Sequence, residues 1–179
     1  MLTTANTVLL LVDIQGKLAG LMYDRNSLYD NLRRLVKGAK VLELPILWAE
    51  QNPKGLGPTI PEVAELLPDL EPIPKFSFSC CDNDKIMQNL RALNRPHVLI
   101  AGIEAHICVY QTARDLTNAE YRVQIVSDAV SSRTIENKQI GLEKSKDAGA
   151  SLTSVETVLF DLLKVAEGAK FKEILNIVK

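Results

Sequence analysis

Residues 98–116 read VLIAGIEAHICVYQTARDL, a short apolar run that leads through a glycine turn into a stretch of helical character. Three further β-branched or leucine-rich runs, at 7–12, 46–49 and 123–126, also alternate with longer stretches whose apolar residues recur at helical spacing. Alternation of this kind predicts βαβ units, in which each strand of a parallel sheet is followed by a helix.

Weaker strand signals occur around 75–78 and 151–155, which brings the expected number of strands to about six. We therefore predict an α/β fold with three layers, α/β/α, in which helices cover both faces of a parallel sheet. A length of 179 residues fits one domain spanning 1–179, with enough apolar sequence to bury most of the surface of the unfolded chain.

Residues 52–74 contain most of the prolines, so this segment is expected to be a long excursion with little regular structure beyond a short turn near 61–67. Loops of this length are often lids over active sites. After it, Asp82 is expected to cap a helix that carries Ile86 and Leu90.

The balance of charge argues against two classes of partner. Lys and Arg total 21 against 22 acidic residues, so a net charge of -1 favours neither nucleic acid nor an anionic membrane. The first residues lack a cationic signal-peptide region, and two of the three cysteines, Cys80 and Cys81, are adjacent and poorly placed to pair. The sequence predicts a reduced, cytoplasmic protein.

Three residues with chemical potential fall where strands are expected to end. Asp13 follows the first strand, Lys75 lies at the third, and Cys108 comes just after the fourth. In open α/β sheets the carboxyl ends of the strands converge on one crevice, so these side chains are expected to meet there.

Cys108 precedes a stretch of helical character, so it is expected in the first turn of a helix, where the helix dipole would lower a thiol pKa of ~8.5. Lys75 would add to this, and Asp13 would take the thiol proton. Each residue also has a plainer interpretation: a buried core cysteine, a turn aspartate and a solvated surface lysine.

The amino-acid sequence around these residues resembles the signature segments of the isochorismatase-like hydrolases. The segments are TVLLLVDIQGKL at 7–18, PKFSFSC at 74–80 and LIAGIEAHICVYQTARDL at 99–116, and WAEQNPKGLG at 48–57 is similar to the isochorismatase domain-containing branch of that family. The resemblance implies Asp13 as general base, Lys75 as the cation that polarises the site and Cys108 as nucleophile.

The same resemblance implies a cis peptide bond between Ile103 and Glu104, and an oxyanion hole built from the backbone N–H groups of Glu104 and Cys108. It also implies assembly into a homo-oligomer. Gln15, Gln51 and Phe76 are expected to contact a small-molecule substrate because they lie near strand ends. His106, beside Cys108, is expected either to contact the substrate or to satisfy a helix N-terminus.

Two departures from better-known relatives narrow the expected activity. The chain has only two histidines, His97 and His106, so a nicotinamidase metal site is not expected, and neither is another metal or cofactor. Isochorismatases that cleave a vinyl ether have Gly at the position of Cys108. What remains is hydrolysis of a small amide or related acyl compound through a Cys108 thioester.

Two other functions stay open. The first is a catalytically silent oligomeric scaffold or binding module with the same fold. The second is a phosphate-handling receiver domain, suggested by Asp13 and Lys75, although the chain lacks an acidic pair beside the first strand and a glycine-rich phosphate loop.

Overall fold

A computed structural model describes all residues from 1 to 179. Six strands form one sheet, all parallel, in the order β3-β2-β1-β4-β5-β6. Their bounds are β1 Thr7–Val12, β2 Ile46–Gln51, β3 Ile73–Lys75, β4 His97–Ile103, β5 Arg122–Ser131 and β6 Ser151–Thr153. The predicted six-stranded parallel sheet is confirmed.

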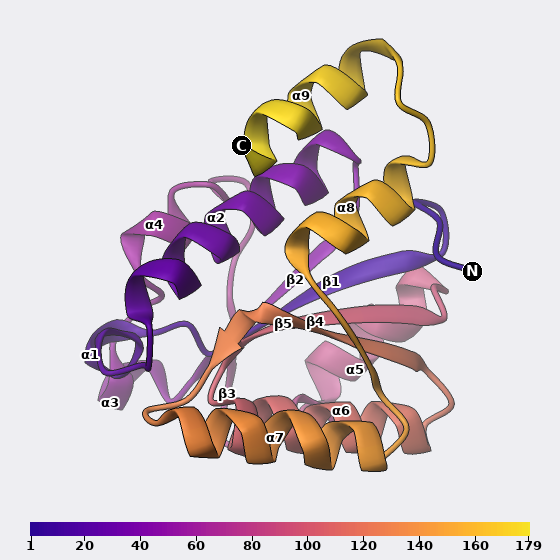
Figure 1. Cartoon of the computed structure of the whole chain (residues 1–179). Helices are drawn as coiled ribbons and strands as arrows, with labels where there is room; N and C mark the ends of the chain where they lie inside the picture. The colour runs from indigo at the N-terminus through magenta and orange to yellow at the C-terminus, as the bar shows by residue number, and fades with distance from the viewer.

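Helices cover both faces of this sheet, as Figure 1 shows, which confirms the three-layer prediction. One face carries α2 Arg25–Val41, α8 Val155–Leu163 and α9 Gly168–Val178, and the other carries α5 Asp84–Leu93, α6 Tyr110–Asn118 and α7 Ile135–Asp147. Three shorter helices are α1 Gly16–Gly20, α3 Pro53–Leu56 and α4 Pro61–Ala64.

The central strands are buried on both sides, which is why they appear in the sequence as continuous apolar runs. Along β1, Leu9 and Leu11 enter the core under α2 and α8, whereas Val8, Leu10 and Val12 enter the core under α5 and α6. Each fully buried aliphatic side chain of this kind contributes about 1.5–3 kcal/mol. The sheet therefore holds its strand ends in fixed positions.

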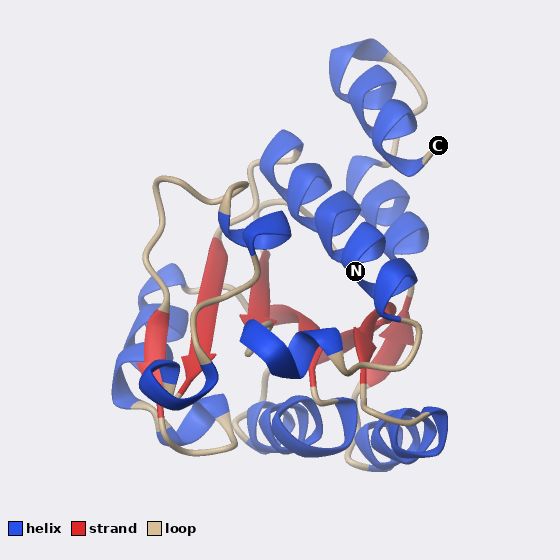
Figure 2. Cartoon of the chain, turned by 90° about the vertical axis from the view of Figure 1, so that its left-hand side faces the viewer, coloured by secondary structure: helices blue, strands red, loops and turns tan.

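The strand order reverses between β1 and β4, because the chain builds outward from β1 through β2 and β3, then returns to its other side with β4. At such a reversal the loops after the two strands diverge and leave a crevice. Figure 2 views the molecule from the side where the strands end, with short helices and loops in front of the sheet.

Several boundaries differ from the sequence-based expectations. The cap of α5 is Asn83, whose side chain accepts a hydrogen bond from Ile86 N–H, and not Asp82. β5 runs on to Ser131 because a register shift opposite β4 lets the strand bend and resume its pairing. The excursion after β2 contains the helices α3 and α4.

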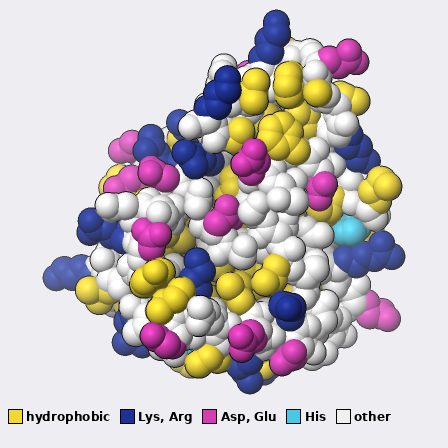
Figure 3. Space-filling model, in the orientation of Figure 1, with side chains coloured by type: hydrophobic (Ala, Val, Ile, Leu, Met, Phe, Trp, Pro, Cys, Tyr) yellow, Lys and Arg dark blue, Asp and Glu magenta, His cyan; other side chains and the backbone are white.

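The surface carries charges of both signs. On the face shown in Figure 3, lysines and arginines alternate with aspartates and glutamates. No helix combines the length and the apolar character that crossing a membrane requires.

Candidate active site

Asp13 and Lys75 form a buried ion pair across the ends of three neighbouring strands. Asp13 directly follows β1 with a positive φ of 54°, and its backbone N–H donates to Ala49 O on β2 at 3.1 Å. Lys75 ends β3, on the far side of β2, and its Nζ lies 2.7 Å from Asp13 Oδ2. Both residues are almost fully buried, with 2% and 1% of their surface exposed, so the surface-lysine interpretation is wrong.

The ammonium of Lys75 is fully satisfied by the protein. Besides Asp13, it donates to Gln51 Oε1 at 2.7 Å and to the backbone oxygens of Ser77 at 3.0 Å and Phe78 at 3.1 Å. A buried charge is tolerated only with partners of this kind. Lys75 therefore fixes both Asp13 and the segment that follows β3.

Cys108 lies beside this pair, in a π-helical turn, Ala105–Val109, that links β4 to α6. It is 7% exposed and is not in the first turn of α6, which begins at Tyr110. Burial raises the pKa of the Cys108 thiol, the charge of Asp13 raises it further, and Lys75 lowers it. The expectation of a lowered pKa is wrong, because burial outweighs the nearby cation.

Asp13 also holds a proton more tightly than usual. Burial raises the pKa of its carboxyl, while the charge of Lys75 and hydrogen bonds from Lys75 and Cys108 lower it. Its second oxygen, Oδ1, is buried and meets no partner at normal hydrogen-bond geometry. The resting site is thus a thiol beside a carboxylate that is more basic than a free one and has an oxygen available.

A pocket of about 110 Å³ opens beside Cys108 and Asp13. Its wall is mostly apolar: five of the nine lining side chains are Leu18, Leu56, Phe78, Ile103 and Ile107. A space of this size holds about four groups the size of a water molecule. The pocket therefore fits a small molecule with an apolar part.

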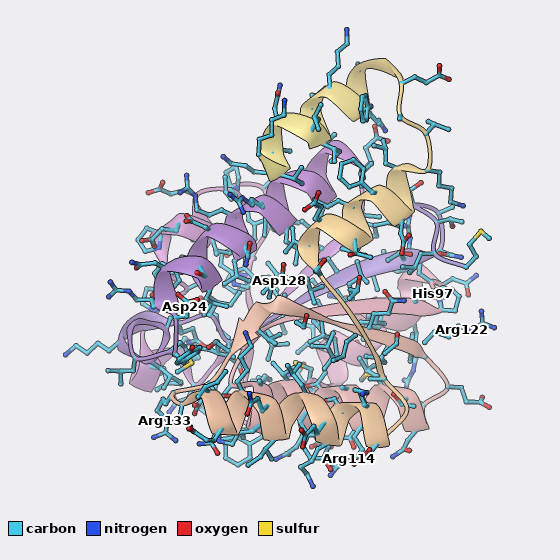
Figure 4. The ribbon with its side chains drawn as sticks, viewed as in Figure 1. Asp24, His97, Arg114, Arg122, Asp128 and Arg133 are labelled. Carbon is cyan, nitrogen blue, oxygen red and sulfur yellow. The ribbon has the colours of Figure 1, made fainter.

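Glu104 lines the pocket and is held by the loop after β5. The Ile103–Glu104 peptide bond is cis, and the backbone N–H of Glu104 donates to no other group of the protein. Its carboxylate accepts from Arg133 N–H at 3.0 Å and from Arg133 Nε at 3.2 Å. Figure 4 places Arg133 where the strands end, beside the start of α7.

The four residues expected to contact substrate differ in their position relative to the pocket. Gln51 lines the pocket, but Gln15 is fully buried behind it, donating to the backbone oxygens of Gln51 and Gly57. Phe76 is 77% exposed and His106, with Nδ1 2.9 Å from Ser132 Oγ, lines no part of the pocket. Gln15 is a supporting residue because its amide links Gln51 at the end of β2 to Gly57 in the segment that follows.

Four pocket residues were missed by reasoning from the sequence: Leu18, Leu56, Phe78 and Ile107. Apolar side chains in helices and loops give no local signal of function, because the same residues commonly complete a core. Their position within the quoted segments 7–18, 48–57, 74–80 and 99–116 is the only hint that the sequence offers.

The two histidines lie apart. Figure 4 shows His97 at the edge where strands begin, opposite the edge that carries Arg133. No group of three His, Cys, Asp or Glu side chains is arranged to hold a metal ion.

Comparison with known proteins identifies the family to which this chain belongs. Residues 7–157 match the model of the isochorismatase domain. The chain belongs to the isochorismatase family of hydrolases. Within that family it is 37% identical over 174 residues to isochorismatase domain-containing protein 2 of Danio rerio, covering 97% of this chain and 87% of that protein.

Solved structures agree with this assignment. A structure described as the MAR1 ribonuclease of Caenorhabditis elegans has a TM-score of 0.92 and 34% identity, covering 99% of this chain and 91% of that one. The YcaC gene product of Escherichia coli, described as an octameric hydrolase of unknown specificity, has a TM-score of 0.93 at 23% identity, covering 98% and 88%. The latter likeness concerns the fold.

Proposed function

We propose that this protein is a cysteine-dependent hydrolase of a small amide or related acyl compound. The observation that carries the proposal is that the Cys108 thiol and the Asp13 carboxylate line one small pocket, while the Lys75 ammonium lies 2.7 Å from Asp13 Oδ2. A nucleophile next to a base that is itself held in place is the general arrangement of covalent catalysis.

In the proposed reaction, Asp13 takes the proton of Cys108 as the sulfur attacks the substrate carbonyl carbon. The carbonyl oxygen gains negative charge, which the unpaired N–H of Glu104 and the N–H of Cys108 stabilise. Asp13 then passes the proton to the amide nitrogen, the C–N bond breaks, and ammonia or an amine leaves. Water attacks the thioester while Asp13 accepts its proton, which returns to the sulfur as the carboxylic acid departs.

The raised pKa values fit this sequence of steps. A thiol that stays protonated at rest needs a neighbouring base, and burial raises the pKa of Asp13, which makes it a stronger base than a free carboxylate. Lys75 keeps Asp13 oriented through the 2.7 Å contact to Oδ2, which leaves Oδ1 for the proton. The three residues therefore have distinct roles.

A screen of small amides by ammonia release tests the proposal. Cys108→Ala should abolish release, whereas Cys81→Ala should retain it, since Cys81 is a partly buried cysteine outside the pocket. Full activity of Cys108→Ala on a substrate of the wild-type protein would refute the mechanism. RNA belongs in the same screen because the C. elegans neighbour is named a ribonuclease, and no release of nucleotides is expected from a pocket without a free cation.

A scaffold without turnover is the second candidate, and the raised pKa of Cys108 is the observation that favours it. In a scaffold, thiol reagents would label Cys108 only at the slow rate expected of a thiol with a raised pKa, and no amide would be hydrolysed. Hydrolysis that depends on Cys108 excludes this candidate.

We also propose that the protein forms a homo-oligomer, with its exposed apolar side chains in the contact. Leu21, Phe76 and Phe78 expose 64%, 77% and 56% of their surface near the edge where the strands end. Light scattering coupled to size exclusion tests this, and a mass of 19.8 kDa would contradict it. The cytoplasmic location stays a prediction.

A further inference from the structure

The side chains that line the pocket indicate which acyl groups it can accept. Of the nine lining residues, only Asp13, Gln51 and Glu104 have polar side chains, and none of them is a cation. The remaining wall is five apolar side chains and the thiol of Cys108. The pocket can therefore bury carbon atoms but offers little to a charged group.

Two cations that pair with lining residues, Lys75 and Arg133, are already engaged. Lys75 donates to four oxygen acceptors, one more than its three N–H bonds can satisfy individually. Arg133 is not among the lining residues, and its Nε pairs with the Glu104 carboxylate at 3.2 Å. Each of these two cations is thus balanced by one carboxylate that lines the pocket, Asp13 or Glu104.

A substrate carboxylate in this space would lose its water without gaining an ionic partner. It would also lie close to the carboxylate of Asp13, which lines the same pocket and carries the same charge. Burial of an uncompensated charge costs several kcal/mol, and every 1.4 kcal/mol is a factor of ten in binding. An anionic acyl group is therefore disfavoured in both binding and reaction.

The volume of the pocket limits the length of the acyl group that it can hold. A pocket of about 110 Å³ has room for about four water-sized groups, which corresponds to the carbonyl and two or three further carbons. Leu56 at the end of α3 forms part of this wall and is half-buried, so the limit is set partly by the segment after β2.

We infer that the site accepts amides with a short apolar acyl group and rejects amides whose acyl group carries a carboxylate. This inference rests on the proposed function for its reaction, but the selectivity of the pocket can be measured without turnover. Iodoacetamide and iodoacetate differ in one group, an uncharged amide against a carboxylate, and both alkylate cysteine.

The first experiment compares the two reagents on the folded wild-type protein. Trypsin separates Cys108, in residues 92–114, from Cys80 and Cys81, in residues 76–85, so mass spectrometry follows Cys108 alone. The ratio of the two rates is normalised to the same ratio in the urea-unfolded protein. A preference for iodoacetamide of about a hundredfold is expected, and a ratio equal to that of the unfolded chain would overturn the inference.

The second experiment compares propionamide with malonamate, in which a carboxylate replaces the terminal methyl. Ammonia release from propionamide alone supports the inference, and equal or faster release from malonamate refutes it. If neither amide is hydrolysed and no other amide is, the proposed function fails, while the labelling ratio still decides the charge selectivity of the pocket.

A variant tests the length limit. Leu56→Ala shortens a wall residue and should shift the preferred substrate toward longer chains, such as pentanamide over propionamide, by about tenfold for one to two extra methylenes. Leu70→Ala is the matched control, because Leu70 is 39% exposed and lies outside the pocket. An unchanged preference in a folded Leu56→Ala protein would contradict the assignment of this wall.

Discussion

Replacing Lys75 by Met should destabilise the protein strongly and in a pH-dependent way. Met has nearly the volume of Lys but no charge, so the change removes the 2.7 Å contact to Asp13 and leaves a buried carboxylate without its partner. Breaking one side of a buried ion pair costs about 3–5 kcal/mol. For a chain of this length the expected fall in Tm is about 6–20 °C.

The sign of the pH dependence follows from Asp13. In the folded wild-type protein burial already raises the pKa of Asp13 above its usual 3.8, and loss of Lys75 raises that pKa further. A carboxyl with a raised folded-state pKa favours the fold below its unfolded-state pKa, and this contribution is lost as the pH rises through the folded-state pKa. The penalty of Lys75→Met should therefore be smaller at pH 5 than at pH 8.

Urea unfolding at both pH values measures this penalty. Lys85→Met is the matched control, because Lys85 is exposed and no ion pair or hydrogen bond involves its side chain. Adding Asp13→Asn to Lys75→Met should recover part of the loss, since it removes the unpaired charge. A penalty under about 1 kcal/mol, equal to that of Lys85→Met and independent of pH, would refute the buried-pair reasoning.

Two further substitutions separate roles within the site. Asp13→Asn removes the charge that raises the pKa of Cys108, so iodoacetamide should label Cys108 faster at neutral pH, while turnover should fall by about 10²–10⁴-fold because the base is lost. Turnover at the wild-type rate would contradict the assignment of Asp13 as base. Gly141→Ala would place a methyl group 2.4 Å from the Ala105 carbonyl carbon, so thermal unfolding should show a loss of about 1–3 kcal/mol and turnover should drop. At Gly20 an added methyl group would have no neighbouring atom within 4 Å, so the control Gly20→Ala should leave stability within about 1 kcal/mol of wild type. Equal losses in the two variants would contradict the close packing of α7 on the turn that carries Cys108.

The fold could be predicted because its signals are local. The runs at β1, β2 and β4 are apolar throughout, and the intervening stretches have a helical period, so a doubly covered parallel sheet is the arrangement that buries both. This arrangement predicts where the strands end, and it therefore also predicts that Asp13, Lys75 and Cys108 lie close together.

The electrostatic state of the site could not be predicted in the same way. The pKa of Cys108 depends on its burial in the turn between β4 and α6, and the sequence suggested only a helix start with a dipole. Likewise, Phe76 and Phe78 differ by two positions along one segment, yet only Phe78 lines the pocket. The burial of Cys108 and the position of Phe78 depend on how segments that are distant in the sequence pack together. The local pattern of residue types does not encode that packing.

The most direct test of the proposed mechanism is the mass of the protein during turnover. Wild-type protein that is acid-quenched while it hydrolyses a small amide should carry the acyl group, and tryptic digestion should find the added mass on residues 92–114, which contain Cys108. Cys108→Ala should show neither the adduct nor ammonia release. Steady hydrolysis by Cys108→Ala, or an acyl group only on residues 76–85, would contradict Cys108 as the nucleophile.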